Sequence, residues 1–194
     1  TSSTISYVLA PRINAAGRMG KAELAAELFL TKDPVRAQAL AAELCEQNKL
    51  RQNEENKILE QTLTRLRREY NPLEDKIIVL AGEGWHQGVI GIVCSRLCDR
   101  YGCPVVLISV DEDGVGKGSG RSIGSFNLFE ALTSCEDLFE RYGGHALAAG
   151  LTVQADRIDE LRTRLRKYAE THVTMAELVP QLHIDCMVQS EWLT

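Results

Sequence analysis

The chain has 194 residues, of which 44% are hydrophobic and 25% charged, and its formal net charge is −5. This composition predicts one globular domain with a substantial extension. The acidic balance argues against a nucleic-acid binder that is basic throughout, but it is compatible with a local basic patch. No apolar run is long enough to span a membrane and no signal peptide opens the chain, so we expect no membrane attachment and a cytoplasmic location. Because the sequence has no initiator Met and stops abruptly at Thr194, we expect a piece of a longer protein.

The first 70 residues are predicted to be largely helical. Segment 10–20, APRINAAGRMG, shows no hydrophobic periodicity and is predicted to be a loop, whereas 21–30 is predicted to be a short helix. Thr31 or Asp33 can then cap a helix that has Pro34 in its first turn, and no other Gly or Pro occurs before Tyr70. This stretch predicts one helix of about 36 residues and ~54 Å, or two stacked helices. Its polar middle favours a solvent-crossing connector over an ordinary surface helix of a bundle.

From residue 73 onward, short apolar runs alternate with helical patterns. Strands are predicted at 76–81, 104–110, 115–121 and 147–153, and helices at 88–101, 126–142 (in one or two pieces) and 155–170. Segment 180–194 has the alternation of a strand that leaves this domain. The predicted fold is α/β, a small sheet of mixed strands flanked by helices and preceded by a long connecting helix. The predicted division of the chain is 1–32, 33–72, 73–172 and 173–194.

The six cysteines could mark a metal site or a core. Cys94, Cys98 and Cys103 are close in sequence and follow His86, so a zinc site is one interpretation. However, no C-x-x-C pair occurs, and Cys94 and Cys98 are one helical turn apart within an apolar helix. Buried, reduced thiols are the favoured interpretation.

The segment 113–127, DGVGKGSGRSIGSFN, is rich in glycine but fits neither a P-loop nor a dinucleotide-binding loop. As a strand, it places Lys117, Ser119 and Arg121 on one face at intervals of about 7 Å, close to the spacing of phosphates along a nucleic-acid strand. Its glycines leave the other face bare, where a ligand or another backbone could approach. A helix that starts near Asn127 adds N–H groups that favour an anion. A packing strand whose cations only face solvent explains these residues equally well.

The segment YGGHALAAG is predicted to stop a helix at Gly143 and Gly144, with a left-handed residue, and to deliver His145 at a turn. This histidine could donate to a phosphate oxygen or act as a general acid. A lone histidine is more often a satisfied structural residue, and nothing nearby in the sequence decides between the two.

Two further segments could contact nucleic acid. Trp85 and His86 follow the first predicted strand, at the end where open α/β sheets bind ligands, and Trp85 could stack on a base or cover the edge of the core. Arg12 and Arg18 suit phosphate contacts, although surface salt bridges are the commoner outcome for such arginines. The sequence shows no arrangement of residues that would break a bond.

The order of these motifs is specific. APRINAAGRMG, a long helix, GWHQGVIGIVCSRL, GKGSGRSIGSFNLFEAL and YGGHALAAG together resemble the C-terminal half of the catalytic core of the RecJ family, single-stranded-DNA-specific 5′→3′ exonucleases of the DHH phosphoesterase superfamily. The resemblance covers about residues 5–170. It implies that 1–32 ends a DHH domain, that 73–172 is a DHH-associated domain and that 173–194 begins an OB-fold. It also implies Mn²⁺ or Mg²⁺ held by Asp and His residues of the DHH domain, N-terminal to Thr1, and no metal held by this chain.

The resemblance also implies roles for individual residues. His145 would be catalytic, facing the scissile or terminal phosphate. The residues expected to bind the DNA or to line its cleft are Arg12, Asn14, Arg18, His86, Gln87, Lys117, Ser119, Gly120, Arg121, Ser122, Gly143 and Gly144. The implied partner is single-stranded DNA, in repair and recombination, with repair proteins as unidentified further partners. We expect the chain alone to bind DNA weakly and not to hydrolyse it.

Three alternatives remain at this point. The first is a DHH-family phosphodiesterase that acts on short oligonucleotides or cyclic dinucleotides, against which the long helix argues. The second is a non-catalytic nucleotide-binding module. The third is a long helix that serves as an oligomerisation or partner surface.

Overall fold

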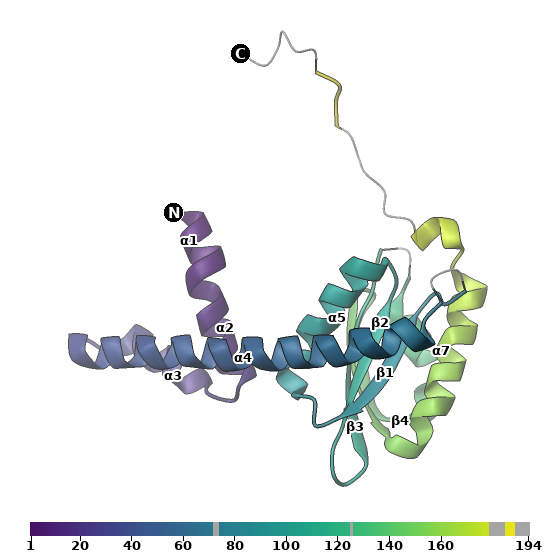
Figure 1. The fold of residues 1–194 in the computed structure, drawn as a ribbon, viewed down its shortest axis with the longest axis horizontal. Helices are drawn as coiled ribbons and strands as arrows, with labels where there is room; N and C mark the ends of the chain where they lie inside the picture. The colour runs from purple at the N-terminus through teal and green to yellow at the C-terminus, as the bar shows by residue number, and fades with distance from the viewer. Residues whose placement is uncertain (72–73, 125, 179–184, 189–194) are drawn as a thin grey trace.

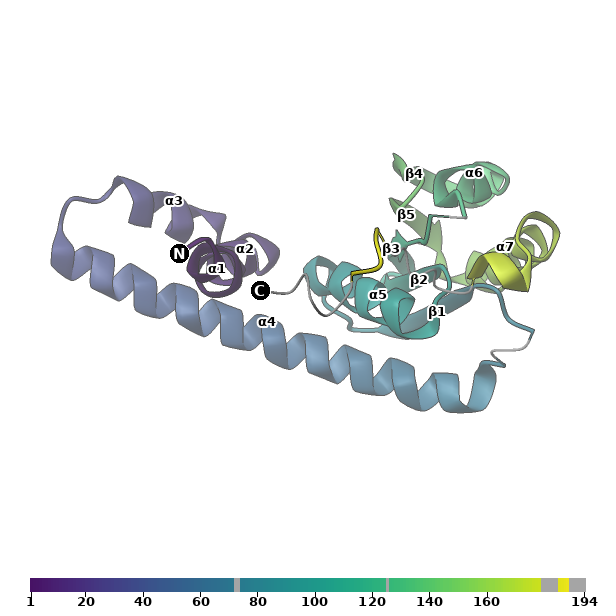
Figure 2. The ribbon, with the colours of Figure 1, turned by 90° about the horizontal axis from the view of Figure 1, so that it is seen from above.

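A computed structural model of the chain describes residues 1–71, 74–124, 126–178 and 185–188. Its central feature is one long helix, α4 (Pro34–Glu69), which carries a helical lobe towards its N-terminal end and an α/β domain towards its C-terminal end (Figure 1). Seen from above, the lobe and the domain lie on the same side of α4 (Figure 2). The helix therefore acts as a long support along which the two parts face each other.

The helical lobe consists of α1 (Ser2–Thr4), a π-helical stretch (Ile5–Leu9), α2 (Ala10–Arg18) and α3 (Ala22–Leu30). Helix α3 confirms the prediction for 21–30. The predicted loop at 10–20 is wrong, because most of that segment forms α2. Its small residue Ala16 packs with Leu40 and Leu44 of α4, so close packing replaces the large apolar side chains that a helical pattern usually shows.

Helix α4 is continuous over 36 residues, so the alternative of two stacked helices is wrong. The Asp33 side chain accepts a hydrogen bond from the Val35 N–H at 2.9 Å, and Pro34 takes the first turn, as predicted. The polar middle is not solvated all round, because Gln47, Asn48 and Glu55 are only 6–8% exposed. Helix α4 contacts both α2 and α5 (Gln87–Tyr101), and Arg96 of α5 donates to Glu55 at 2.8 Å.

The α/β domain is built on a five-stranded mixed sheet in the order β1-β2-β3-β5-β4. The strands are β1 (Ile78–Glu83), β2 (Val105–Val110), β3 (Val115–Arg121), β4 (Phe139–His145) and β5 (Ala148–Gln154). The β1–β2 pair is parallel and is connected through α5, while the other pairs are antiparallel. The fold class predicted from the sequence, a small mixed sheet flanked by helices, is confirmed.

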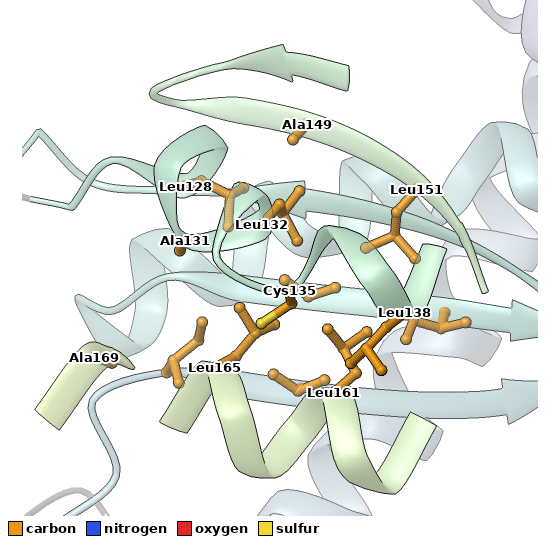
Figure 3. Packing of buried hydrophobic residues seen from close by; sticks show 14 of the residues in the cluster. Leu128, Ala131, Leu132, Cys135, Leu138, Ala149, Leu151, Leu161, Leu165 and Ala169 are labelled. Carbon is orange, nitrogen blue, oxygen red and sulfur yellow. The ribbon is translucent and has the colours of Figure 1, made fainter. Parts of the chain in front are cut away.

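Two hydrophobic clusters hold helices to the two faces of the sheet. On one face, α4 and α5 cover Val105 and Leu107 of β2. On the other face, α6 (Leu128–Thr133) and α7 (Ile158–His172) cover a cluster that includes Leu132, Leu151 and Leu161, drawn in Figure 3. Figure 2 shows α5 on the side of the sheet that is turned towards α2, and α7 on the opposite side.

The region predicted to be helical at 126–142 differs from the prediction. Only α6 and a short 3₁₀ turn (Glu136–Leu138) are helical, and Phe139–His145 form the edge strand β4. The strand forms because Tyr142 and Phe139 pair with Leu151 and Val153 of β5, and both aromatic rings pack against the cluster under α6 and α7.

The strand predicted at 180–194 falls largely outside the described residues. Residues 185–188 are described and have no regular secondary structure. The segment that follows α7 contains a 3₁₀ turn (Met175–Leu178). Within the part of the chain that the structure describes, no helix is both long and apolar enough to cross a membrane.

Candidate nucleic-acid interface

Strand β3 presents its polar side chains on the α5 side of the sheet. Lys117, Ser119 and Arg121 pair with Ser109, Leu107 and Val105 of β2, so they share the face that α4 and α5 partly cover. The alternation predicted for this strand is confirmed.

The glycine face of β3 is filled rather than bare. An added Cβ would lie 2.8 Å from the Leu151 side chain at Gly118, 2.8 Å from Ile108 at Gly116 and 2.6 Å from Leu128 at Gly120. These glycines therefore admit core side chains of the α6–α7 face, and the expected access for a ligand on that face is wrong.

Hydrogen bonds within β3 hold Arg121 in place, and helix α5 packs beside it. The Arg121 guanidinium donates to the Gly120 carbonyl at 2.7 Å and to Ser119 Oγ at 3.3 Å, and the Cys94 thiol donates to the Ser119 carbonyl at 2.9 Å. Gly91 of α5 leaves room for both side chains, because a Cβ there would lie 2.9 Å from Ser119 Oγ and 3.1 Å from Arg121 Nη2. Guanidinium N–H groups of Arg121 that these contacts do not use could still donate to a phosphate.

Beyond α5, the same face continues over β5 and β4. The sheet register aligns Lys117 with Thr152 and Arg141, Ser119 with Gly150 and Gly143, and Arg121 with Ala148 and His145. We call these nine residues the open face. No side chain fills the centre of the open face. An added Cβ at Gly143 would meet no described atom within 4 Å, and an added Cβ at Gly150 would meet only the Gly118 carbonyl oxygen at 3.7 Å.

A cavity of about 400 Å³ lies at one end of the open face, lined by Lys117, Arg141, Gly143, Gly150 and Thr152 among others. Among the described residues, neither Lys117 nor Arg141 nor Arg121 has a carboxylate within ion-pair distance. Arg164, by contrast, pairs with both Asp137 and Glu160. The cations of the open face are thus available to an anion.

His145 ends β4 and lies exposed at the β4–β5 hairpin. Its Nδ1 accepts a hydrogen bond from the Leu147 N–H at 3.3 Å, so the neutral ring carries its proton on Nε2. Gly144 has φ +150°, and a Cβ there would lie 2.3 Å from the Ala148 carbonyl oxygen, so this hairpin requires glycine. The predicted helix stop is wrong, but the placement of His145 at a turn is confirmed.

The other predicted residues surround the junction between α2 and α5. His86 caps α5 by accepting the Gly88 N–H at Nδ1 at 3.1 Å, and Gln87 is exposed beside it. Arg18 donates to the Gly88 carbonyl at 3.1 Å. These three residues lie together between the helical lobe and the sheet.

Several candidates are engaged within the protein. Arg12 donates to Cys45 Sγ at 3.2 Å and to the Val8 carbonyl. Ser122 donates its hydroxyl to the Phe126 carbonyl at 2.7 Å, while Asn14 is exposed on α2. Trp85 is 4% exposed and donates its indole N–H to Gln61 at 2.7 Å, so it covers the core and does not stack on a base.

Sequence reasoning missed Arg141 and Thr152. Their membership of the open face depends on β4 and on its register with β5, which no local pattern specifies. The alternation of the strand predicted at 147–153 could have pointed to Thr152.

The cysteines and carboxylates give no metal site in the described ranges, where no three His, Cys, Asp or Glu residues are close enough to hold an ion. Cys94, Cys98 and Cys103 are buried, as predicted. Burial raises the pKa of the Cys94 and Cys103 thiols to about 12 and that of Cys98 to about 11, so all three stay protonated at neutral pH.

Residues 74–171, half of the chain, match the family model of the DHHA1 domain. The chain belongs to the DHHA1 domain family. The open face therefore lies on the DHHA1 domain itself, while α4 and the helical lobe precede it.

Relatives of the whole chain are RecJ proteins. This chain is 39% identical over 192 residues to the single-stranded-DNA-specific exonuclease RecJ of Bacillus subtilis, and the match covers 98% of this chain and 24% of the relative. It is also 39% identical over 183 residues to the single-stranded-DNA-specific exonuclease RecJ of Thermus thermophilus, and that match covers 91% of this chain and 26% of the relative. The crystal structure of exonuclease RecJ bound to manganese matches with a TM-score of 0.82 at 38% identity, covering 92% of this chain and 44% of that one. T. thermophilus RecJ in complex with Mg²⁺ gives 0.78 at 40% identity, covering 88% and 26%. The chain thus spans about a quarter of the length of the curated relatives it matches.

Proposed function

We propose that the whole protein is a metal-dependent, single-stranded-DNA-specific 5′→3′ exonuclease of DNA repair and recombination, and that the DHHA1 domain described here holds the DNA strand. The observation that carries this proposal is the open face. Three cations without carboxylate partners and one exposed histidine lie there around a centre of glycine and alanine. The similarity to proteins named as single-stranded-DNA-specific exonucleases supports the choice of ligand.

The geometry of the open face suits a sugar–phosphate backbone. Lys117, Ser119 and Arg121 are two strand residues apart, which corresponds to about 7 Å for each step. Gly143 and Gly150 allow a strand of DNA to approach the protein main chain closely. Apart from His145, the open face carries no aromatic side chain, so we expect it to bind phosphates with little dependence on the bases.

His145 and Arg121 lie in the same row across the sheet. We propose that the Nε2–H of His145 donates to a phosphate oxygen at the scissile or terminal position and that Arg121 binds a neighbouring phosphate. Such fixed donors stabilise the charge that develops on phosphate during hydrolysis. His86, Gln87 and Arg18 would line the neighbouring part of the cleft, between the helical lobe and the sheet.

The residues described here do not fit a metal site. We therefore derive no hydrolytic step from this chain and expect the purified chain to bind single-stranded DNA without cleaving it. A cytoplasmic location and interactions with repair proteins stay predictions.

The test is a pair of assays on the purified chain. Fluorescence anisotropy with a labelled single-stranded oligonucleotide and a duplex of the same sequence measures binding, and we expect the single strand to bind more tightly. A nuclease assay with Mn²⁺ measures turnover, and we expect none. Absence of single-strand binding at low salt would contradict the assigned role of the open face. Metal-dependent cleavage would contradict the expectation that this chain binds DNA without cleaving it.

A further inference from the structure

The open face consists of three rows of aligned residues, each with one residue from β3, β5 and β4. The first row is Arg121, Ala148 and His145, the middle row is Ser119, Gly150 and Gly143, and the end row is Lys117, Thr152 and Arg141. Successive rows are two strand residues apart, so about 13 Å separates the first row from the end row. This separation corresponds to two of the ~7 Å steps that suit neighbouring phosphates, so the three rows offer three phosphate positions.

The end row places two cations on either side of a hydroxyl group. Thr152 lies between Lys117 and Arg141, and adjacent strands are about 4.8 Å apart, so both long side chains can reach a common point above the Thr152 hydroxyl. Lys117 and Arg141 are exposed, and neither side chain makes an ion pair or a hydrogen bond with the residues that the structure describes. The half-buried Thr152 hydroxyl is likewise without a partner among them. All three residues line the cavity of about 400 Å³ at this end of the open face.

The middle row offers less to a phosphate. Gly143 and Gly150 carry no side chain, so Ser119 supplies the side-chain donor of this row. The Ser119 hydroxyl accepts from the Arg121 guanidinium at 3.3 Å and keeps its own proton to donate. A neutral hydroxyl binds a phosphate more weakly than a cation does. The middle row therefore allows close approach, while the first row and the end row supply charge.

Acidic side chains lie beyond the end row. Gln154 is the next residue on this side of β5, and its side-chain amide donates to the carboxylate of the exposed Glu140. The turn that leads into β3 adds the exposed residues Asp111, Glu112 and Asp113 at the same end of the sheet. A phosphate placed beyond the end row would approach these like charges, which disfavours it. The end row is therefore the last favourable position for a phosphate.

We infer that the end row is a separate subsite for one phosphodiester of the DNA strand, and that it is the last phosphate subsite on the open face. The inference rests on the proposed function, because it takes the open face as the surface that holds DNA. Lys117 and Arg141 would donate to phosphate oxygens from opposite sides, and the Thr152 hydroxyl would donate from below. The phosphate two nucleotides away would lie at the first row, and the phosphate between them would cross the glycines of the middle row.

Tetrathymidylate without terminal phosphates tests this arrangement, because it has three phosphodiesters. Its binding to the ¹⁵N-labelled chain is measured by NMR at low salt, beside analogues in which one linkage is an uncharged methylphosphonate. We expect a middle methylphosphonate to weaken binding by less than about threefold and either outer one by roughly tenfold, because an outer replacement removes a charge-assisted contact. A middle replacement that weakens binding as much as an outer one would overturn the assignment of the rows.

Variants locate the outer phosphate at the end row. Arg141→Gln should weaken tetrathymidylate binding by roughly fivefold, whereas Lys167→Gln, which removes an exposed cation from α7, should not change it. The effect of Arg141→Gln should disappear when the methylphosphonate occupies one of the two outer linkages, and it should persist at the other. Equal effects of Arg141→Gln on both outer analogues would contradict the subsite. Circular dichroism verifies that each variant is folded.

Strands of different length test the acidic boundary. Affinity should rise steeply from trithymidylate to tetrathymidylate and little from there to pentathymidylate. Glu140→Gln should improve pentathymidylate binding by roughly twofold, as expected for one exposed charge, and Glu170→Gln on α7 should not improve it. An equal gain in affinity for each added nucleotide, or equal effects of the two glutamate variants, would refute the boundary.

Two further comparisons separate this inference from the proposed function. Inorganic phosphate should bind the end row at least tenfold more weakly than tetrathymidylate, and equal binding would mark a site for the free ion and overturn the assignment to DNA. Failure of every oligothymidylate to bind the unmodified chain would refute the proposed function and the inference together. Binding that Arg121→Ala weakens, but that Arg141→Gln and Lys167→Gln affect equally, would overturn the end row alone.

Discussion

At the scale of single residues, the cations of the open face differ in how firmly the protein holds them. Arg121 is partly covered by α5 and bonded to Ser119 and the Gly120 carbonyl, whereas Lys117 and Arg141 are exposed. A guanidinium that is already fixed loses less conformational entropy when it binds a phosphate, and it can bind in a bidentate manner. Arg121 should therefore contribute more to binding than either exposed cation.

Arg121→Ala is expected to weaken single-stranded DNA binding by about 1.5–3 kcal/mol, as for a lost hydrogen bond to a charged group, and to exceed the effects of Lys117→Ala and Arg141→Ala. Fluorescence anisotropy at several salt concentrations measures both affinity and salt dependence, and the slope should fall by roughly 0.7 for each lost phosphate contact. Lys167→Ala, on the far side of the sheet, is the control. An Arg121→Ala variant that binds like this control would refute the role of Arg121.

Substitutions at two glycines of the sheet test which face of the sheet packs in the core and which face binds DNA. Gly118→Ala places a methyl group 2.8 Å from Leu151 in the core, so it should destabilise the fold by about 1–3 kcal/mol without altering the open face. Gly143→Ala meets no described atom within 4 Å, so it should leave stability nearly unchanged but narrow the centre of the open face and weaken DNA binding. Urea unfolding and anisotropy separate the two effects. The reverse pattern would show that the DNA approaches the glycine face of β3.

At the scale of secondary-structure elements, the sequence predicted what local signals specify. Asp33, Pro34 and the absence of further Gly or Pro predicted α4, and alternation predicted the polar face of β3. The sequence did not predict helix α2, because the burial of α2 depends on alanines that fit against α4. It did not predict β4, because the pairing of β4 with β5 is non-local. For the same reason the sequence predicted Lys117 and Arg121 for the site but not Arg141, which depends on the β4 register.

One buried carboxylate links α4 to α5 beside their shared hydrophobic cluster. Glu55 is 7% exposed and accepts from Arg51 on its own helix and from Arg96 on α5. The Arg51 side chain is 13% exposed, so Glu55→Ala would leave a largely buried guanidinium without its charge partner and should cost about 3–5 kcal/mol.

Arg96→Ala is the matched comparison, because the Arg96 side chain is 49% exposed and its loss leaves the Arg51–Glu55 pair intact. Its cost should be no more than about 1 kcal/mol. Urea unfolding of both variants measures the difference. An equal loss of unfolding free energy in the two variants would mean that Glu55 contributes only through a surface ion pair with Arg96.

At the scale of the whole molecule, the helical lobe and the DHHA1 domain meet where α2 ends and α5 begins. Gly88 is essential to this approach, because a Cβ there would lie 2.2 Å from the Arg18 carbonyl oxygen, a backbone atom that cannot rotate away. Helix α4 joins the two parts independently of this contact. Separating α2 from α5 should therefore change the shape of the molecule without unfolding either part.

Gly88→Ala is expected to open the molecule and to increase its radius of gyration in small-angle X-ray scattering, because α2 and α5 must move apart. The open face lies within the DHHA1 domain, so binding of single-stranded DNA by the chain should persist. Arg18→Ala, which removes only the side-chain hydrogen bond to the Gly88 carbonyl, should change the shape less, and Gly17→Ala, whose Cβ would meet no described atom within 4 Å, should not change it. An unchanged radius for Gly88→Ala would show that α4 alone sets the position of the lobe, and a loss of DNA binding would show that the strand also depends on the α2–α5 junction.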